Sequence, residues 1–267
     1  MSEVHRVRDE RRDTGAQPAR VALVFSYEAA WHFEIQPQGR SWDYWQLVLA
    51  WYGCARRLAL SLDVVGAAAD LSVYDLVLIP SLPIVPPALL QSLSATEAAV
   101  VIGPRTGSRT REFHIPAGLP PGLLQSLLPL TVIASESLPA DLRIPATYRT
   151  QSVAGQWWLD HVQTELSPLV TDGSGRGLLY RHRTLHAFTT VPDDAFLTAV
   201  LHSLCDERGV PNTPLPEGLR VRRCGAAMYA FNHAPVPRTI PAALRRGALD
   251  LGDWTLPPAG VARWRLL

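Results

Sequence analysis

The chain has 267 residues, among them 25 arginines, no lysine and 24 acidic residues, and its formal net charge is +1. This length can bury one large core and a smaller second one. The near-neutral charge gives no electrostatic basis for binding nucleic acid or an anionic membrane, and no apolar run is long enough to span a bilayer.

The cysteines and the N-terminal segment indicate where the protein resides. Cys54, Cys205 and Cys224 are too far apart in the sequence to form a metal-binding pair, which predicts reduced, mostly buried thiols. Residues 1–19 mix both charge signs with little apolar content and predict a disordered leader. Because this segment lacks the apolar centre of a signal peptide, the protein is predicted to be cytoplasmic.

Expected strands and helices alternate over residues 20–103. The β-branched run RVALVF predicts a strand buried on both faces. After a polar loop, residues 41–60 predict a helix with Ser41 as its N-cap. Strands are then expected at 62–67 and 74–81, a helix at 86–96 and a fourth strand at 97–103. This order predicts βαβ units and a mostly parallel, flavodoxin-like sheet with helices on both faces.

The sequence pattern changes in the second half of the chain. Residues 120–129 predict a short helix, whereas residues 140–168 show no regular pattern. A hairpin is expected over 175–191 and a helix over 193–209. From Pro211 onward, short alternating runs separated by Gly, Pro and Asn predict a small antiparallel β domain. The expected domains are therefore 20–210 and 211–267.

The segment AVVIGPRTGSRT, residues 99–110, runs from a predicted strand into a glycine-flanked loop. A phosphate-binding loop of the Walker type needs a lysine, and the dinucleotide fingerprint GxGxxG is absent. The spacing of Gly103, Arg105 and Gly107 fits instead a nucleophile elbow, G-x-Nuc-x-G. In class I glutamine amidotransferases a cysteine occupies the middle position, and a later histidine serves as base.

Neither partner of that Cys–His pair is present here. Arg105 stands at the nucleophile position, and a protonated guanidinium has no lone pair with which to attack a carbonyl. Val191 stands where the histidine would be. The elbow is therefore predicted to have no nucleophilic catalytic activity. Arg105, Thr106 and Arg109 are predicted to bind an anion or a sugar, or to fix the loop or pair across an interface.

Aromatic side chains crowd the expected first helix. Trp42, Tyr44, Trp45, Trp51 and Tyr52 spread beyond a single helical face, so they cannot all point into one core stripe. Trp, Tyr and Arg are enriched at protein interfaces. The aromatic set therefore predicts a contact with another domain or subunit, and the alternative is a helix covered on both sides by its own chain.

A more specific resemblance rests on several motifs in order. These are LVFSYEAAWHFEIQPQGRSWDY, YDLVLIPSLPIV, VVIGPRTGSRT, VPDDAFLTAVL and LPEGLRVRRCGAAMYAFNHAPVP. Over residues 20–267 the chain resembles the middle and C-terminal domains of glycoside hydrolase family 42 β-galactosidases. The resemblance implies a trimerisation domain with the class I glutamine amidotransferase-like fold, followed by a small β domain.

In that family the two catalytic glutamates lie in an N-terminal (β/α)8 barrel, which no segment of this sequence resembles. No catalytic residue is therefore predicted, and Glu28 and Glu34 do not match the family's acid or nucleophile. The expected function is non-catalytic association, as a homo-trimer or with a separately encoded barrel chain. The alternatives are a sugar- or anion-binding module and, less favoured, a β-galactosidase active on its own. No metal, cofactor, nucleic acid or membrane partner is expected.

Overall fold

The structure, a computed structural model, describes residues 19–266. They form two compact units, of which the larger contains residues 20–54 and 62–210 and the smaller contains residue 19, 55–61 and 211–266. The leader predicted at residues 1–19 lies, apart from Ala19, outside the described residues and stays a prediction.

A seven-stranded sheet forms the centre of the larger unit, in the order β2-β1-β3-β4-β10-β9-β8. Strands β1 to β4 and β10 run parallel, β9 is antiparallel to β10, and the edge strand β8 is antiparallel to β9. The bounds are β1 Val21–Val24, β2 Leu62–Val65, β3 Leu76–Ile79, β4 Ala99–Ile102, β8 Pro168–Thr171, β9 Gly177–His182 and β10 Leu185–Phe188. The predicted mostly parallel sheet is confirmed, and every residue of β1, β3, β4 and β10 is buried.

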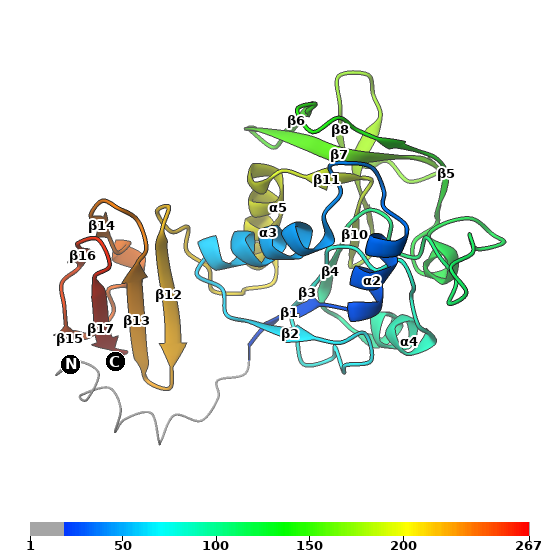
Figure 1. Cartoon of the computed structure of the whole chain (residues 1–267). Coiled ribbons are helices and arrows are strands. Elements are labelled where there is room, and N and C mark those ends of the chain that lie inside the picture. Colours follow the sequence, from blue (N-terminus) through cyan, green and yellow to red (C-terminus); the bar gives the residue numbers. More distant parts are fainter. Residues whose placement is uncertain (1–18, 267) are drawn as a thin grey trace. The chain divides into compact units, whose positions relative to one another are not determined.

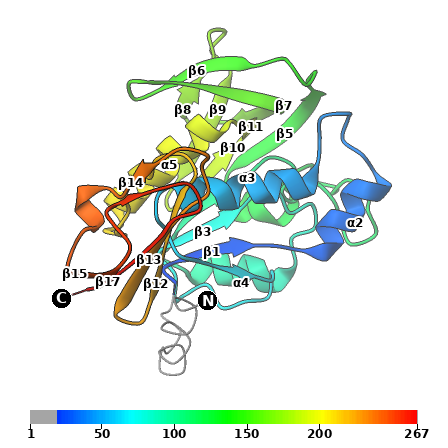
Figure 2. The ribbon, with the colours of Figure 1, turned by 60° about the vertical axis from the view of Figure 1, so that its left-hand side comes forward.

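Helices cover both faces of this sheet. α3 (Tyr44–Arg57) and α4 (Pro87–Ala95) lie on opposite sides of the parallel strands (Figures 1 and 2). Right-handed crossovers require this, because the chain moves from β1 to β2 in one direction and from β3 to β4 in the other. α5 (Asp194–Glu207) lies beside α3, with the Cys54 sulfur 3.7 Å from the Asp194 carbonyl oxygen.

A second, antiparallel sheet occupies the segment that was expected to be irregular. Strand β7 (Gln151–Thr164) pairs with β5 (Leu130–Ser137), β6 (Ile144–Tyr148) and β11 (Thr190–Pro192). The prediction for residues 140–168 was wrong. The burial of β7 does not alternate regularly along the strand, so the period-two signal on which the expectation depended is absent.

The segment between β1 and α3 also differs from the expectation. Residues Tyr27–Ile35 form helix α2, not a polar loop, and the Ser26 hydroxyl caps it by accepting the Ala29 N–H at 3.3 Å. α3 begins at Tyr44, so Ser41 is not its cap. The Asp43 carboxylate accepts the Gln46 N–H at 3.0 Å instead. Both helices mix buried and exposed aromatics, which hides their periodicity.

The remaining secondary-structure predictions for the larger unit are confirmed, except that one predicted helix is of the 3-10 type. The expected hairpin is β9 followed by β10, and the expected helix after it is α5, capped by the Asp193 carboxylate at 2.7 Å from the Phe196 nitrogen. The short helix expected at 120–129 is a 3-10 helix, Gly122–Ser126.

The smaller unit is antiparallel, as expected. Its main sheet has the order β12-β13-β17-β15, and a second pair joins β14 to β16. The bounds are β12 Leu219–Cys224, β13 Ala227–Asn232, β14 Arg238–Thr239, β15 Ala248–Leu251, β16 Thr255–Leu256 and β17 Val261–Arg265. Its core contains the fully buried Trp264 and six aliphatic side chains. The buried Asn232 amide donates to the carbonyls of Val236, Leu256 and Pro257.

Two glycines of the larger unit provide a test of the packing at the end of β4. A Cβ atom on Gly103 would lie 1.8 Å from the Pro80 carbonyl oxygen, whereas a Cβ on Gly53, within α3, would meet nothing within 4 Å. We expect Gly103→Ala to lower the free energy of unfolding by about 3 kcal/mol or more, because backbone must move. Gly53→Ala is the control and should raise it by about 0.5–1 kcal/mol.

Urea unfolding monitored by circular dichroism measures both changes. Equal effects of the two substitutions would show that the close approach at Gly103 is absent from the folded protein.

Candidate functional site

The loop after β4 has the geometry of an elbow at the carboxyl edge of the parallel strands. Arg105 has a φ of +66° and Gly107 a φ of +69°. The left-handed conformation is strained for a long side chain by about 1–3 kcal/mol. A Cβ on Gly107 would lie 2.1 Å from the Pro121 carbonyl oxygen, so this position also requires glycine. The elbow predicted from the glycine spacing is therefore present.

Thr106 holds the elbow in place. Its hydroxyl donates to the Gly103 carbonyl at 2.8 Å and accepts the Leu82 N–H at 3.2 Å. The N–H groups of Gly107 and Arg109 donate to the carbonyls of Leu82 and Pro83, each at 2.9 Å. Thr106 is buried and its hydroxyl is used twice within the loop, so it fixes the loop, which is one of the alternatives predicted for it.

Arg105 points into the protein, against the second sheet. Its guanidinium carbon lies 4.9 Å from the centre of the Trp158 ring, a cation–π contact. Burial lowers the pKa of Arg105 to about 10, although the charge of Asp160 opposes this. Burial in turn raises the pKa of the Asp160 carboxyl, which accepts hydrogen bonds from Ser135 and Trp158 at 2.6 and 2.7 Å. Arg105 therefore stays protonated and cannot act as a nucleophile.

Arg109 and His32 lie on the other side of the loop. Arg109 is half-buried and donates to the Ser108 carbonyl at 2.9 Å and to the Gln36 side chain at 3.4 Å. His32, on α2, is fully buried and stacks on the Phe113 ring at 5.2 Å between centroids. Burial, followed by the charges of Arg109 and Arg105, lowers the pKa of His32 to about 4, so its imidazole is neutral at neutral pH.

Sequence reasoning missed His32 because its segment was expected to be a loop. Helix α2 brings it to the elbow, and the only local signal was Ser26 in front of a run with helix-forming alanines.

Buried polar atoms without a hydrogen-bond partner gather in this part of the larger unit. In the larger unit they are both ring nitrogens of His32, the hydroxyls of Ser81 and Ser108, Nε of Arg105 and the indole N–H groups of Trp42 and Trp51. Ser81 follows β3 and Ser108 follows the elbow, so both stand at the carboxyl edge of the sheet.

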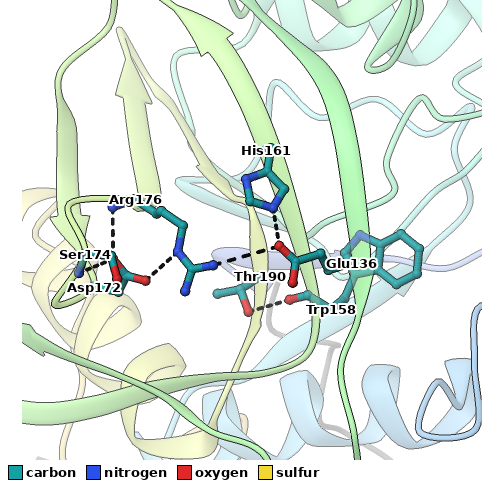
Figure 3. A network of polar contacts seen from close by, with 7 residues as sticks. All are labelled: Glu136, Trp158, His161, Asp172, Ser174, Arg176 and Thr190. Atoms are coloured by element: carbon teal, nitrogen blue, oxygen red, sulfur yellow. Dashed lines mark hydrogen bonds and ion pairs between the residues drawn. The ribbon is translucent and has the colours of Figure 1, made fainter.

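In a neighbouring polar network, by contrast, the polar side chains have hydrogen-bond or ion-pair partners (Figure 3). Arg176 donates to Asp172 at 2.7 Å and lies 3.9 Å from Glu136, which also bonds His161. The Asp172 carboxylate accepts the N–H groups of Ser174 and Arg176, each at 2.9 Å. This network joins β5 and β7 to the turn between β8 and β9. Its hydrogen bonds are made within the chain, so nothing in it calls for a ligand.

The structure divides the five predicted interface aromatics. Trp42, Tyr44 and Trp51 are buried in the chain's own core, whereas 44% of Trp45 is exposed. Trp51 meets Phe188 of β10, and Trp42 meets Trp158 of β7. The interface prediction is therefore corrected for the three buried residues, because the two sheets cover them. Trp45 and Tyr52 remain available to a partner.

Trp45 belongs to a larger exposed apolar surface, which we name the α2–α3 patch. Its members are Tyr27, Trp31 and Ile35 on α2 and Trp45, Leu49 and Tyr52 on α3. Each set recurs at the three- and four-residue spacing of one helical face. The Tyr27 ring lies 6.2 Å from the rings of both Trp31 and Trp45, so the two helices present one continuous surface.

Other kinds of site are not found over residues 19–266. No three His, Cys, Asp or Glu side chains are placed together to hold a metal ion, and no helix is long and apolar enough to cross a membrane. Val191, at the position of the amidotransferase base, is buried in β11.

Comparison with known proteins agrees with this geometry. A β-galactosidase from Thermus thermophilus is 41% identical over 98% of this chain and 41% of its own length. The crystal structure of β-galactosidase from the psychrophilic Marinomonas ef1 superposes with a TM-score of 0.92 at 31% identity, covering 99% of this chain and 40% of that one. The β-galactosidase from Halorubrum lacusprofundi gives a TM-score of 0.87 at 27% identity, covering 95% and 40%.

This chain thus spans about two fifths of the length of the relatives that it matches. The family model described as the beta-galactosidase trimerisation domain matches residues 19–174, more than half of the chain. The elbow, the sheet order and these matches lead to one conclusion: the chain belongs to the beta-galactosidase trimerisation domain family, within the glycoside hydrolase family 42 enzymes that its motifs resemble.

Proposed function

We propose that this chain is the subunit-association part of a β-galactosidase and that it assembles with further copies of itself into a trimer. The observation that carries the proposal is the α2–α3 patch in a member of the trimerisation domain family. The patch combines four exposed aromatic rings on α2 and α3 with the aliphatic Ile35 and Leu49. Tyr and Trp are enriched at the buried centres of protein interfaces.

The patch lies on a rigid base. The opposite side of α2 carries Ala29, Ala30 and Phe33 into the core, and Phe33 meets Trp42 and Tyr44. The exposed side chains therefore cannot be buried by rotating α2 without exposing others. Contiguous apolar surface of this kind on a soluble protein typically marks an interaction site.

A second copy is the occupant that fits best. In a closed threefold ring each copy presents its surface to a different surface of the next copy, so one patch suffices for the whole assembly. The description of the family model that matches residues 19–174, a trimerisation domain, supports this threefold assembly. We therefore place this chain with a catalytic (β/α)8 barrel in the complete β-galactosidase, whether covalently joined or separately encoded.

The acidic residues of α2 do not provide a catalytic pair. Glu28 and Glu34 are exposed and stand six positions apart on one helix, about 120° from each other around its axis. A retaining glycosidase needs two carboxyl groups about 5–5.5 Å apart that flank the sugar. Carboxylates pointing in different directions from one exposed helix cannot flank a substrate in this way.

We further propose a cytoplasmic location. Cys54 and Cys205 are buried free thiols, and Cys224 is a half-buried one. Free thiols persist in reducing compartments, whereas secreted proteins oxidise them.

The mass in solution tests the proposed association. Leu49 in the patch and Val73 outside it are matched exposed aliphatic residues, at 66% and 70% exposure. We expect the unmodified protein to show the mass of three 29.3 kDa chains by light scattering after gel filtration. Leu49→Glu should weaken the association at least about tenfold, because a charge must be desolvated in the interface. Val73→Glu should leave the mass unchanged.

A monomeric mass at every protein concentration would overturn the proposed self-association. Equal effects of both substitutions would place the interface elsewhere.

A chromogenic galactoside tests the non-catalytic role. We expect the purified chain to give no turnover above buffer, and the Glu28→Gln, Glu34→Gln double variant to be indistinguishable from it. Measurable turnover by the chain that the double variant abolishes would overturn this part of the proposal.

A further inference from the structure

The association proposed above makes no use of the unpartnered polar atoms around the elbow. Five of them belong to His32, Ser81, Arg105 and Ser108, and each of these residues is more than nine-tenths buried. A buried polar atom left without a partner costs about 1–3 kcal/mol. The large majority of buried side-chain polar atoms in folded proteins have a hydrogen-bond partner in the protein or in ordered water.

Hydrogen bonds bring the four residues to one place. The segment 81–83 is bonded to the elbow through Leu82 and Pro83, which pair with Thr106, Gly107 and Arg109. Ser108 donates its N–H to the Arg105 carbonyl at 3.3 Å. Arg109 reaches Gln36 at the end of α2, and Gln36 in turn bonds the His32 carbonyl at 2.8 Å. The end of β3, the elbow and α2 thus meet at one edge of the sheet.

The charge of this place is positive. Arg105 and Arg109 both act on His32, and over the described residues neither arginine forms a salt bridge. Asp160 is the nearby acid. Burial raises the pKa of its carboxyl, and its Oδ1 atom already accepts from Ser135 and Trp158. Two guanidinium groups near one carboxyl leave a positive excess that an anion would balance.

The available groups are mainly donors. Two serine hydroxyls, Nε of Arg105, the half-buried Arg109 guanidinium and one N–H of a neutral histidine can all donate to oxygen. We propose that His32, Ser81, Arg105, Ser108 and Arg109 bind a small oxyanion, of the phosphate, sulfate or carboxylate type, at the carboxyl edge of the parallel sheet. This set differs from the one predicted from the sequence: Thr106 leaves it, Ser108 of the same loop enters, and His32 and Ser81 enter from other segments.

Phe113 covers the site. Its ring stacks on His32, yet 39% of the residue is exposed, so it separates the imidazole from solvent. Its φ of +63° is unusual for a bulky side chain. Because the ring is held by stacking and not by hydrogen bonds, its displacement gives a small ion a route to the buried groups.

Calorimetry on the full chain at constant ionic strength tests the proposal. The probes are inorganic phosphate, sulfate and acetate, with neutral galactose as a control. We expect saturable binding of at least one anion and none of galactose. Binding of phosphate and sulfate alone assigns a tetrahedral oxyanion, and binding of acetate alone assigns a carboxylate.

Two arginines of the same segment provide matched variants. Arg109→Gln should weaken binding of the preferred anion about tenfold or more, because a charge-assisted hydrogen bond is lost. The exposed Arg111→Gln should change it less than about twofold, since it removes the same charge outside the site. Ser108→Ala should weaken binding without changing the charge.

Nuclear magnetic resonance of the imidazole provides a second readout. A bound anion stabilises protonated His32, so its pKa should rise from about 4 when the preferred anion is added. The proposal is overturned if no anion binds, if Arg109→Gln and Arg111→Gln weaken binding equally, or if a crystal structure with added anion shows only water beside Ser81 and Ser108. None of these results depends on whether the chain forms trimers.

Discussion

The close approach of two backbone segments at the end of β4 is the constraint on which the larger unit depends. Gly103 comes so near the Pro80 carbonyl, and Gly107 so near that of Pro121, that no side chain fits at either position. The chain between them has to turn sharply, which forces Arg105 into the left-handed region. The turn then directs the following residues back across the carboxyl edge, where they meet α2 and the end of β3.

This loop has the backbone shape of a nucleophile elbow, but its central side chain packs within the protein. A nucleophile at the central position would face substrate, whereas the long Arg105 side chain reaches Trp158 and the neighbourhood of Asp160 on β7. The loop thereby contributes to packing between the parallel sheet and the antiparallel one. Fold and chemistry are separable in this way because the backbone geometry requires only the glycines, while the reaction requires a particular side chain. The polar groups left around the loop, His32 among them, are then available for binding without catalysis.

Helices α2 and α3 show how one stretch of aromatic residues performs two tasks. Trp42, Tyr44 and Trp51 face the chain's own sheets, and Tyr27, Trp31 and Trp45 face outward. The sequence indicated an excess of aromatics over what one core stripe can bury, and that excess is present. It could not indicate which rings were in excess, because α2 and the second sheet, which decide this, were not recognised. Burial of a side chain depends on the element that covers it, and that element comes from a distant part of the chain.

By itself the sequence determined the parallel sheet, the hairpin of β9 and β10, helix α5, the small antiparallel unit and the elbow. Each of these is encoded locally, in a buried run of residues, a capping residue or a pair of glycines at fixed spacing. The tertiary structure alone decided the sheet around β7, whose strand lacks alternation, and the capping of α3 by Asp43 instead of Ser41. It also decided the meeting of His32, Ser81 and Ser108, which come from three separate segments. Their proximity arises from strand order and crossover direction, and these are properties of the whole sheet that no local pattern contains.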